Sequence, residues 1–231
     1  MKLQKLREEV LEANLELVRR GLVLYTFGNA SGIARGDDLV VIKPSGVAYD
    51  TMKPEDLVVV DLEGNIVEGS LRPSSDLPTH LILYNAFPGL GGVAHTHSRA
   101  ATSWAQAGQE IPCFGTTHAD YFHGCVPVTK PLTPAQIRSD YEMNTGRAIV
   151  RCLGKQDPLH VPGVLVTGHA PFCWGETPAT ATHNAVVLEE IAAMALQTLV
   201  ANPKARSISK PLHEKHFFRK HGSKAYYGQK K

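Results

Sequence analysis

Hydrophobic side chains near the start of the chain recur at intervals of three or four residues. The positions are Leu3, Leu6, Val10, Ala13 and Leu17. This spacing places them on one face of a helix, so we predict an amphipathic helix over residues 2–20 that ends at Gly21.

Shorter runs rich in β-branched and aromatic residues follow, and they predict strands. These runs cover residues 22–27, 39–43, 57–62, 66–67, 91–95, 126–128 and 164–166. Longer stretches predict helices over residues 77–87, 100–107, 178–200 and 212–220. Another helix should begin at Thr133-Pro134, with the threonine as its cap and the proline in its first turn.

These strands and helices alternate without a regular strand-helix-strand repeat, and turn signals favour hairpins early in the chain. We therefore expect an α/β fold with a mainly antiparallel sheet rather than a doubly wound parallel one. The 231 residues are enough for one sizeable core, so we expect a single domain over residues 1–231.

The overall composition is that of an ordinary globular protein, with 43% hydrophobic and 20% charged residues. A formal net charge of +2 gives no general case for binding nucleic acid or a membrane surface. No uninterrupted apolar run approaches the roughly 18 residues of a membrane span, so we expect none.

The four cysteines and residues 1–20 indicate the cellular compartment of the protein. The four cysteines form no Cys-x-x-Cys pair, which argues against a disulfide framework and against a cysteine-based zinc site. Residues 1–20 are charged throughout and do not resemble a secretory signal. We expect reduced thiols and a cytoplasmic protein.

The most informative polar motif is the pair His95 and His97 at the end of the predicted strand 91–95. Side chains two residues apart in an extended chain point the same way, so both rings can face one ion. His169 follows another apolar run and offers a third imidazole. Three imidazoles with an open position are the layout of a catalytic zinc site. Surface histidines, or hydrogen-bonded core histidines, are the alternative interpretation.

Three polar segments carry small hydroxyls, two of them with glycine amides and one of these two with a lysine, which suits the binding of a phosphate. The segments are residues 28–32, 43–46 and 72–76. None of them is a P-loop or a dinucleotide-binding fingerprint. Taken one at a time, each segment can also be a plain turn.

Two further regions contain candidate chemistry. Asp120, within residues 115–121, can act as a general acid or base, or it can cap a turn. The last residues, 210–231, hold seven Lys and Arg against one Glu, interleaved with aromatic side chains. This segment is short for nucleic-acid recognition. It is either a solvated face or an arm that reaches over an active site, a neighbour's included, to supply positive charge.

Taken together, these motifs resemble the class II aldolase and adducin family over nearly the whole chain. The matching positions are Asn14 and residues 26–31, 41–46, 73–76, 79–80, 95–98, 115–121, 162–165, 169–175, 215–222 and 224–229. The Thr-Thr-His-Ala-Asp-Tyr segment and the Ala-Tyr-Tyr-Gly-Gln ending resemble the epimerase branch of that family rather than its fuculose- or rhamnulose-phosphate aldolases.

The resemblance implies a three-layer fold, with helices on both sides of the sheet, and a homotetramer whose active sites lie between subunits. It implies one zinc ion, although imidazole sites also accept manganese or cobalt. By residue, it implies His95, His97, His169 and Asp76 at the metal, and Asp120 and Tyr227 as the acid/base pair. The implied substrate contacts are Gly28, Asn29, Lys43, Ser45, Gly46, Ser74, Ser75, Thr116, His216 and Arg219.

The implied reaction converts L-ribulose 5-phosphate into D-xylulose 5-phosphate. The hydrogen on C4 is not activated by the C2 carbonyl, whereas the C3–C4 bond is placed for retro-aldol cleavage into the enediolate of dihydroxyacetone and glycolaldehyde phosphate. Zinc would act as the Lewis acid. Two alternatives stay open: an aldolase acting on a related ketose phosphate, and a non-catalytic interaction module, which should lack the histidines. The pathway, arabinose or ascorbate breakdown, is also open.

Overall fold

A computed structural model describes residues 1–222 and 225–228 of the chain. Lys224, Gln229 and the terminal Lys230-Lys231, which belong to the motifs above or follow them, lie outside the described residues. The strands form one sheet in the order β4-β3-β2-β1-β5-β7-β6, with every pair of neighbours antiparallel. They are β1 Asn29–Ala34, β2 Leu39–Ile42, β3 Val58–Asp61, β4 Ile66–Glu68, β5 Gly92–His95, β6 Gly163–Leu165 and β7 Pro171–Gly175.

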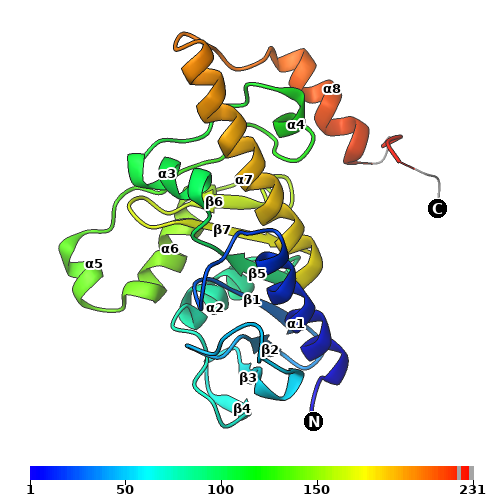
Figure 1. Ribbon diagram of the computed structural model, residues 1–231, viewed down its shortest axis with the longest axis vertical. Coiled ribbons are helices and arrows are strands. Elements are labelled where there is room, and N and C mark those ends of the chain that lie inside the picture. Colours follow the sequence, from blue (N-terminus) through cyan, green and yellow to red (C-terminus); the bar gives the residue numbers. More distant parts are fainter. Residues whose placement is uncertain (223–224, 229–231) are drawn as a thin grey trace.

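Helices flank this sheet and cap one end of the molecule (Figure 1). They are α1 Gln4–Arg19, α2 Leu77–Ala86, α3 Arg99–Ala107, α4 Thr116–Ala119, α5 Pro134–Arg138, α6 Tyr141–Leu153, α7 Pro178–Ala201 and α8 Lys210–Lys220, with a 3-10 turn at Pro54–Asp56. The expected helix boundaries agree closely for α1, α2, α3, α7 and α8. Thr133 caps α5 as predicted, because its side chain accepts a hydrogen bond from the Gln136 amide.

Two neighbouring residues of β1 show why the fold has three layers. The Ser31 hydroxyl is 2.7 Å from His80 Nδ1 on α2, on one face of the sheet. A side chain added at Gly32 would instead meet Pro178 of α7 and Val10 of α1, on the other face. Since successive strand residues alternate faces, the sheet is covered by helices on both sides. The expected antiparallel three-layer fold is confirmed.

The sequence interpretation was wrong about residues 22–34. Residues 22–27 were predicted to be a strand, yet they form a loop, and the polar segment after them is the central strand β1. Leu22 and Val23 pack into the core, whereas Tyr25 is 86% exposed and has a φ of +53°. A left-handed backbone cannot continue an extended run. The small polar residues of β1 suggested a turn, although β2 and β5 bury them.

Two elements on the C-terminal side of the sheet were not predicted. β7 begins with Pro171 and ends with Gly175, and the buried face of α6 includes the small or polar residues Asn144, Thr145 and Gly146. Proline is tolerated as the first residue of a strand, so β7 lies between β5 and β6 without losing pairing. The predicted strand 126–128 forms only isolated bridges, with Ile111 and Leu165.

One helix, α7, is apolar enough by length and composition to cross a membrane. The sequence expectation concerned uninterrupted apolar runs, and Glu189 and Glu190 divide the apolar residues of α7 into shorter ones. In the structure α7 contacts β5 and β7 as well as α1 and α3. The core helix of a soluble protein passes the same test, so one such helix does not indicate a membrane protein.

Candidate active site

The three histidines selected from the sequence meet at one end of the central strands. The ring centroids of His95 and His97 are 4.9 Å apart, and each lies 5.0 Å from the His169 ring. One potential ligand atom from each residue lies within 4.8 Å of the other two. β5 ends at His95, the extended chain continues to His97, and His169 occupies the turn before β7. Because β5 pairs with β7, with His95 opposite Phe172, segments distant in sequence become neighbours in space.

The donor atoms fit a divalent cation. The Nε2 atoms of His95 and His97 are 3.2 Å apart. Two nitrogens bound tetrahedrally to one zinc ion at about 2.0–2.1 Å would be separated by roughly 3.3 Å. His95 Nδ1–H donates to the Pro171 carbonyl at 2.9 Å, which leaves Nε2 free to bind. This is the orientation that metal-binding histidines adopt.

Burial keeps all three rings in the form that binds metals. It lowers the pKa of His95 to about 3, and it also lowers the pKa values of His97 and His169. Desolvation is the largest cause at each ring, because a charged imidazolium loses hydration in the protein. The rings are therefore neutral near pH 7, with a lone pair available. In the described ranges, this is the one group of at least three such side chains that converge closely enough to hold an ion.

Asp76 lies beside the histidines without belonging to that group. It occupies the position just before α2, and its Oδ2 accepts a hydrogen bond from Asn29 Nδ2 at 2.7 Å. Burial opposes its ionisation, but the neighbouring His95 and His80 and the Asn29 hydrogen bond outweigh that effect, so the Asp76 pKa lies below its usual value. Asp76 is thus an ionised carboxylate close to the histidines of the metal centre.

A polar cleft of about 300 Å³ adjoins Asp76. Its walls are two loops held together by backbone pairing: the Ser45 amide donates to the Arg72 carbonyl at 2.9 Å, and the Ser74 amide donates to the Lys43 carbonyl at 3.0 Å. The structure thereby brings together seven of the residues expected to contact substrate. They are Gly28, Asn29, Lys43, Ser45, Gly46, Ser74 and Ser75.

Lys43 gives this cleft a buried positive charge. The residue is 2% exposed, its Nζ donates to the Val47 carbonyl at 2.8 Å, and the amine lies 4.7 Å from the centre of the Tyr49 ring. Burial lowers the Lys43 pKa to about 8, so the side chain is still mostly cationic at pH 7. Within the part of the chain that the structure describes, no carboxylate forms an ion pair with it. An unpaired buried cation suits an anionic group such as a phosphate.

Gly28 connects the cleft to the metal centre. It has a φ of +71°, and a Cβ there would lie 2.6 Å from the His95 carbonyl oxygen. A larger residue would push the loop away from β5, so glycine is required for the close approach. The Asn29 side chain that follows is 1% exposed, and its Oδ1 has no partner among the described residues. It is free to accept a hydrogen bond from a ligand.

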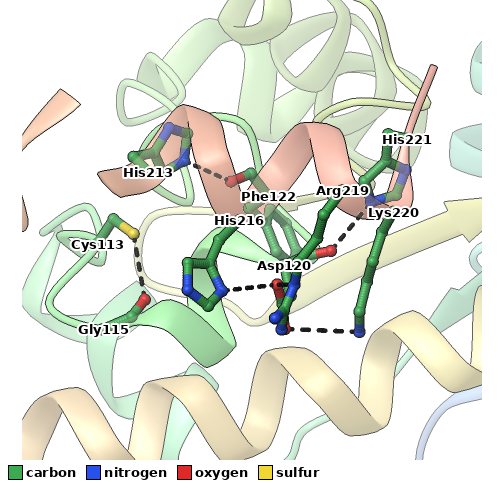
Figure 2. Close-up of polar contacts among 9 residues, drawn as sticks. All are labelled: Cys113, Gly115, Asp120, Phe122, His213, His216, Arg219, Lys220 and His221. Atoms are coloured by element: carbon green, nitrogen blue, oxygen red, sulfur yellow. Dashed lines mark hydrogen bonds and ion pairs between the residues drawn. The ribbon is translucent and has the colours of Figure 1, made fainter. Parts of the chain in front are cut away.

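The remaining predicted residues form a second group, between α4 and α8 (Figure 2). Asp120 follows α4, and its carboxylate accepts hydrogen bonds from Arg219 at 3.0 and 2.7 Å and lies 3.1 Å from His216 Nδ1. Thr116 begins α4, and the Tyr227 ring lies 5.0 Å from the Arg219 guanidinium. Although burial opposes it, pairing with Arg219 and His216 keeps the Asp120 pKa below its usual value.

This second group lies apart from the metal centre within one chain. In the described part of the chain, every hydrogen bond and ion pair of the Asp120 carboxylate goes to α8. Figure 1 places α4 and α8 at one end of the long axis, beyond the sheet. The structure therefore divides the predicted site residues into two clusters.

Comparison with known proteins agrees with this geometry. Residues 8–196 match the family model described as Class II Aldolase and Adducin N-terminal domain. The chain belongs to the class II aldolase and adducin family. The resemblance noted in the sequence is therefore confirmed.

Within this family the chain is most informatively compared with an epimerase. It is 56% identical over 228 residues to L-ribulose-5-phosphate 4-epimerase UlaF of Salmonella paratyphi C (strain RKS4594), an alignment that covers 99% of this chain and 100% of that protein. UlaF of Salmonella choleraesuis (strain SC-B67) matches to the same extent. The expectation of an enzyme from the epimerase branch is borne out.

A solved structure supports the fold. An L-fuculose 1-phosphate aldolase superposes with a TM-score of 0.80 at 24% identity, covering 93% of this chain and 95% of that one. Identity this low speaks for the class II aldolase fold alone.

One residue that contacts the predicted site was missed in the sequence. Tyr141, the first residue of α6, places its hydroxyl 3.2 Å from His169 Nδ1. Neither its spacing nor a turn signal singled it out. Lys220, which belongs to the basic C-terminal segment noted in the sequence, places its Nζ 3.6 Å from Asp120.

Proposed function

We propose that this protein converts L-ribulose 5-phosphate into D-xylulose 5-phosphate by inverting C4, with one bound divalent cation, zinc in the first instance. The observation that carries the proposal is the convergence of three neutral imidazoles beside a cleft that contains a buried, unpaired lysine. Close similarity to proteins named L-ribulose-5-phosphate 4-epimerase supports this substrate.

The reaction breaks and re-forms the C3–C4 bond of the sugar. The proton leaves the C4 hydroxyl as that bond breaks, which yields the enediolate of dihydroxyacetone and glycolaldehyde phosphate. The aldehyde presents its other face, the bond re-forms, and the new C4 oxygen takes up a proton. When bound at the three histidines, the ion would supply Lewis-acid stabilisation of the negative charge on the ketose oxygens.

The protein must keep the aldehyde fragment from leaving. Lys43, together with the hydroxyls and amides of Ser45, Ser74 and Ser75, would hold its phosphate in the cleft. Asn29 Oδ1, which has no partner in the described residues, would accept a hydrogen bond from a substrate hydroxyl. Anchoring at the phosphate allows the carbonyl end to turn while the fragment stays bound.

Two proton-transfer groups are needed, one for each configuration at C4. We assign these roles to Asp120 and Tyr227, with Thr116, His216 and Arg219 as further substrate contacts. Since Asp120 is bound to α8 rather than to the metal centre in one chain, we propose that a second copy delivers the α4–α8 group. The assembly would be a homotetramer with active sites between subunits.

The cysteines bear on the compartment. All four are unpaired, and burial raises the pKa values of Cys113, Cys125, Cys152 and Cys173. Neutral, buried or partly buried thiols without disulfides suit a reducing compartment. We propose a cytoplasmic enzyme.

The deciding experiment supplies L-ribulose 5-phosphate to the purified protein and measures three products: D-xylulose 5-phosphate, glycolaldehyde phosphate and dihydroxyacetone. We expect xylulose 5-phosphate without release of the two fragments. Activity should disappear after chelation and return with zinc, and metal analysis should find one ion per chain. Net release of fragments would identify an aldolase instead. Sedimentation of the holoenzyme tests the tetramer separately.

A further inference from the structure

The three metal-centre histidines are not held equally firmly. His95 is 2% exposed, and a backbone carbonyl fixes its Nδ1. His169 is half-buried and lies in the turn between β6 and β7, next to Gly168, which has a φ of +71° and is exposed. Packing and strand pairing therefore fix the first ring, whereas the second needs another restraint.

The side chain that supplies this restraint belongs to Tyr141. Its hydroxyl lies 3.2 Å from His169 Nδ1, and the two rings are 6.1 Å apart. Because Nδ1 is occupied by this contact, Nε2 is the nitrogen of His169 left for an ion. A ring that binds through Nε2 carries its proton on Nδ1, so His169 donates and the tyrosine oxygen accepts.

Tyr141 is itself well anchored. It is the first residue of α6, and Thr145 Oγ1, one turn later, donates to its carbonyl at 2.9 Å. The next residue, Glu142, accepts a hydrogen bond at its carbonyl from Thr79 of α2 at 2.6 Å. α2 begins just after Asp76, so the start of α6 connects the carboxylate side of the centre to the turn that carries His169.

We propose that Tyr141 is a positioning residue of the metal centre: its hydroxyl fixes the tautomer and the orientation of His169 and thereby sets the affinity for the ion. The proposal rests on the function proposed above and adds a residue to it. Hydrogen-bond partners of metal-bound histidines typically change metal affinity by about 10–100-fold. We expect a loss of that size when the hydroxyl alone is removed.

The test uses the full-length protein and the variant Tyr141→Phe, which keeps the ring and deletes the oxygen. Zinc affinity is measured by competition with a chromogenic chelator, and the visible absorption of the cobalt form reports the ligand geometry. We expect a Kd for zinc raised about 10–100-fold, a shifted cobalt spectrum and an unchanged melting temperature of the metal-free protein. Tyr121→Phe is the matched control, because Tyr121 is a half-buried tyrosine that contacts Lys220 and His183 rather than a metal-centre histidine.

The outcomes separate the two proposals. Equal zinc affinity and identical cobalt spectra in wild type and Tyr141→Phe would overturn the role of Tyr141 and leave the proposed function intact. A lower melting temperature of the metal-free variant with unchanged zinc affinity would also overturn it, by showing a purely structural role. Failure of the wild-type protein to bind zinc or cobalt would defeat the proposed function itself.

Discussion

The metal centre and the α4–α8 group both contain predicted site residues, but they are organised by different forces. Strand pairing delivers His95 to the metal centre, and burial keeps its ring neutral. Asp120 stays ionised because cationic side chains from α8 surround it. The first arrangement is a property of one folded chain, because the backbone of central strands cannot shift independently. The second depends on side-chain charges, which a neighbouring chain or a phosphate can also satisfy.

This contrast bears on mechanism. Groups that bind a metal must converge to within a few tenths of an ångström, and a buried sheet provides that precision. Groups that exchange protons with a moving aldehyde must reach two positions, and side chains on a short helix and a chain end allow this. We therefore predict that substitutions at the metal centre reduce metal binding, whereas substitutions in the α4–α8 group reduce turnover and leave the metal bound.

The largest effect should follow His97→Asn, which removes one of the three imidazoles. We expect loss of bound metal and a fall in epimerase activity of about a thousandfold or more, since Lewis-acid stabilisation contributes several kcal/mol. Metal content and turnover are measured on the same preparation. His160→Asn, a 41% exposed histidine side chain near α8, should keep its metal. Full metal occupancy and activity in His97→Asn would refute the assignment of the centre.

The next effect separates chemistry from metal binding. Tyr227→Phe and Asp120→Asn should each retain the metal while activity falls by about 10²–10⁴-fold, the usual contribution of a general acid or base. Tyr227 is 61% exposed in one chain, so loss of its hydroxyl should not change the melting temperature. Wild-type turnover in Tyr227→Phe would remove the phenol from the mechanism. Loss of metal in either variant would show that the α4–α8 group and the metal centre do not act independently.

The burial of His80 should also make the stability of the protein depend on pH. Burial lowers the pKa of His80 from 6.5 to about 4. As the pH falls below 6.5, the unfolded chain takes up a proton that the folded chain still excludes. The free energy of unfolding therefore decreases between about pH 6.5 and pH 4, by about 3 kcal/mol for this one residue.

Urea unfolding of metal-free protein at pH 7 and pH 4, compared between wild type and His80→Gln, isolates that contribution. The variant should lose about 3 kcal/mol less over this range than the wild type, whatever its absolute stability. An identical loss in the two proteins would show that His80 is not held neutral by burial.

The smallest effect concerns a single charge of the α4–α8 group. Lys220→Gln removes one of the two Lys and Arg charges beside Asp120 and should cost about 1 kcal/mol or less, with the cost shrinking at high salt. Arg19→Gln on the exposed face of α1 is the comparison and should change stability less than Lys220→Gln does. A large, salt-independent loss for Lys220→Gln would mean that packing rather than charge holds α8.

Much of the fold could be predicted from the sequence, because the start, end and buried face of a helix depend on residues that are close together along the chain. The apolar spacing of α1, the glycine after it and the cap at Thr133 each specify an element without distant partners. The motif residues, including the three histidines and the lysine of the cleft, were also identifiable, because imidazole, hydroxyl and ammonium groups in such segments limit the chemistry available.

Only the tertiary structure decided which segments pair and which site residues meet. β1 looks like a turn until β2 and β5 enclose it, and residues 22–27 look like a strand, although Tyr25 has a left-handed backbone and the segment pairs with none of the described strands. Tyr141 acquires a role only because α6 packs beside the turn that holds His169. Hydrophobic periodicity and the chemical type of each residue are local properties of the sequence. Strand order, burial and side-chain contacts depend on partners that are distant in sequence, and no local pattern encodes them.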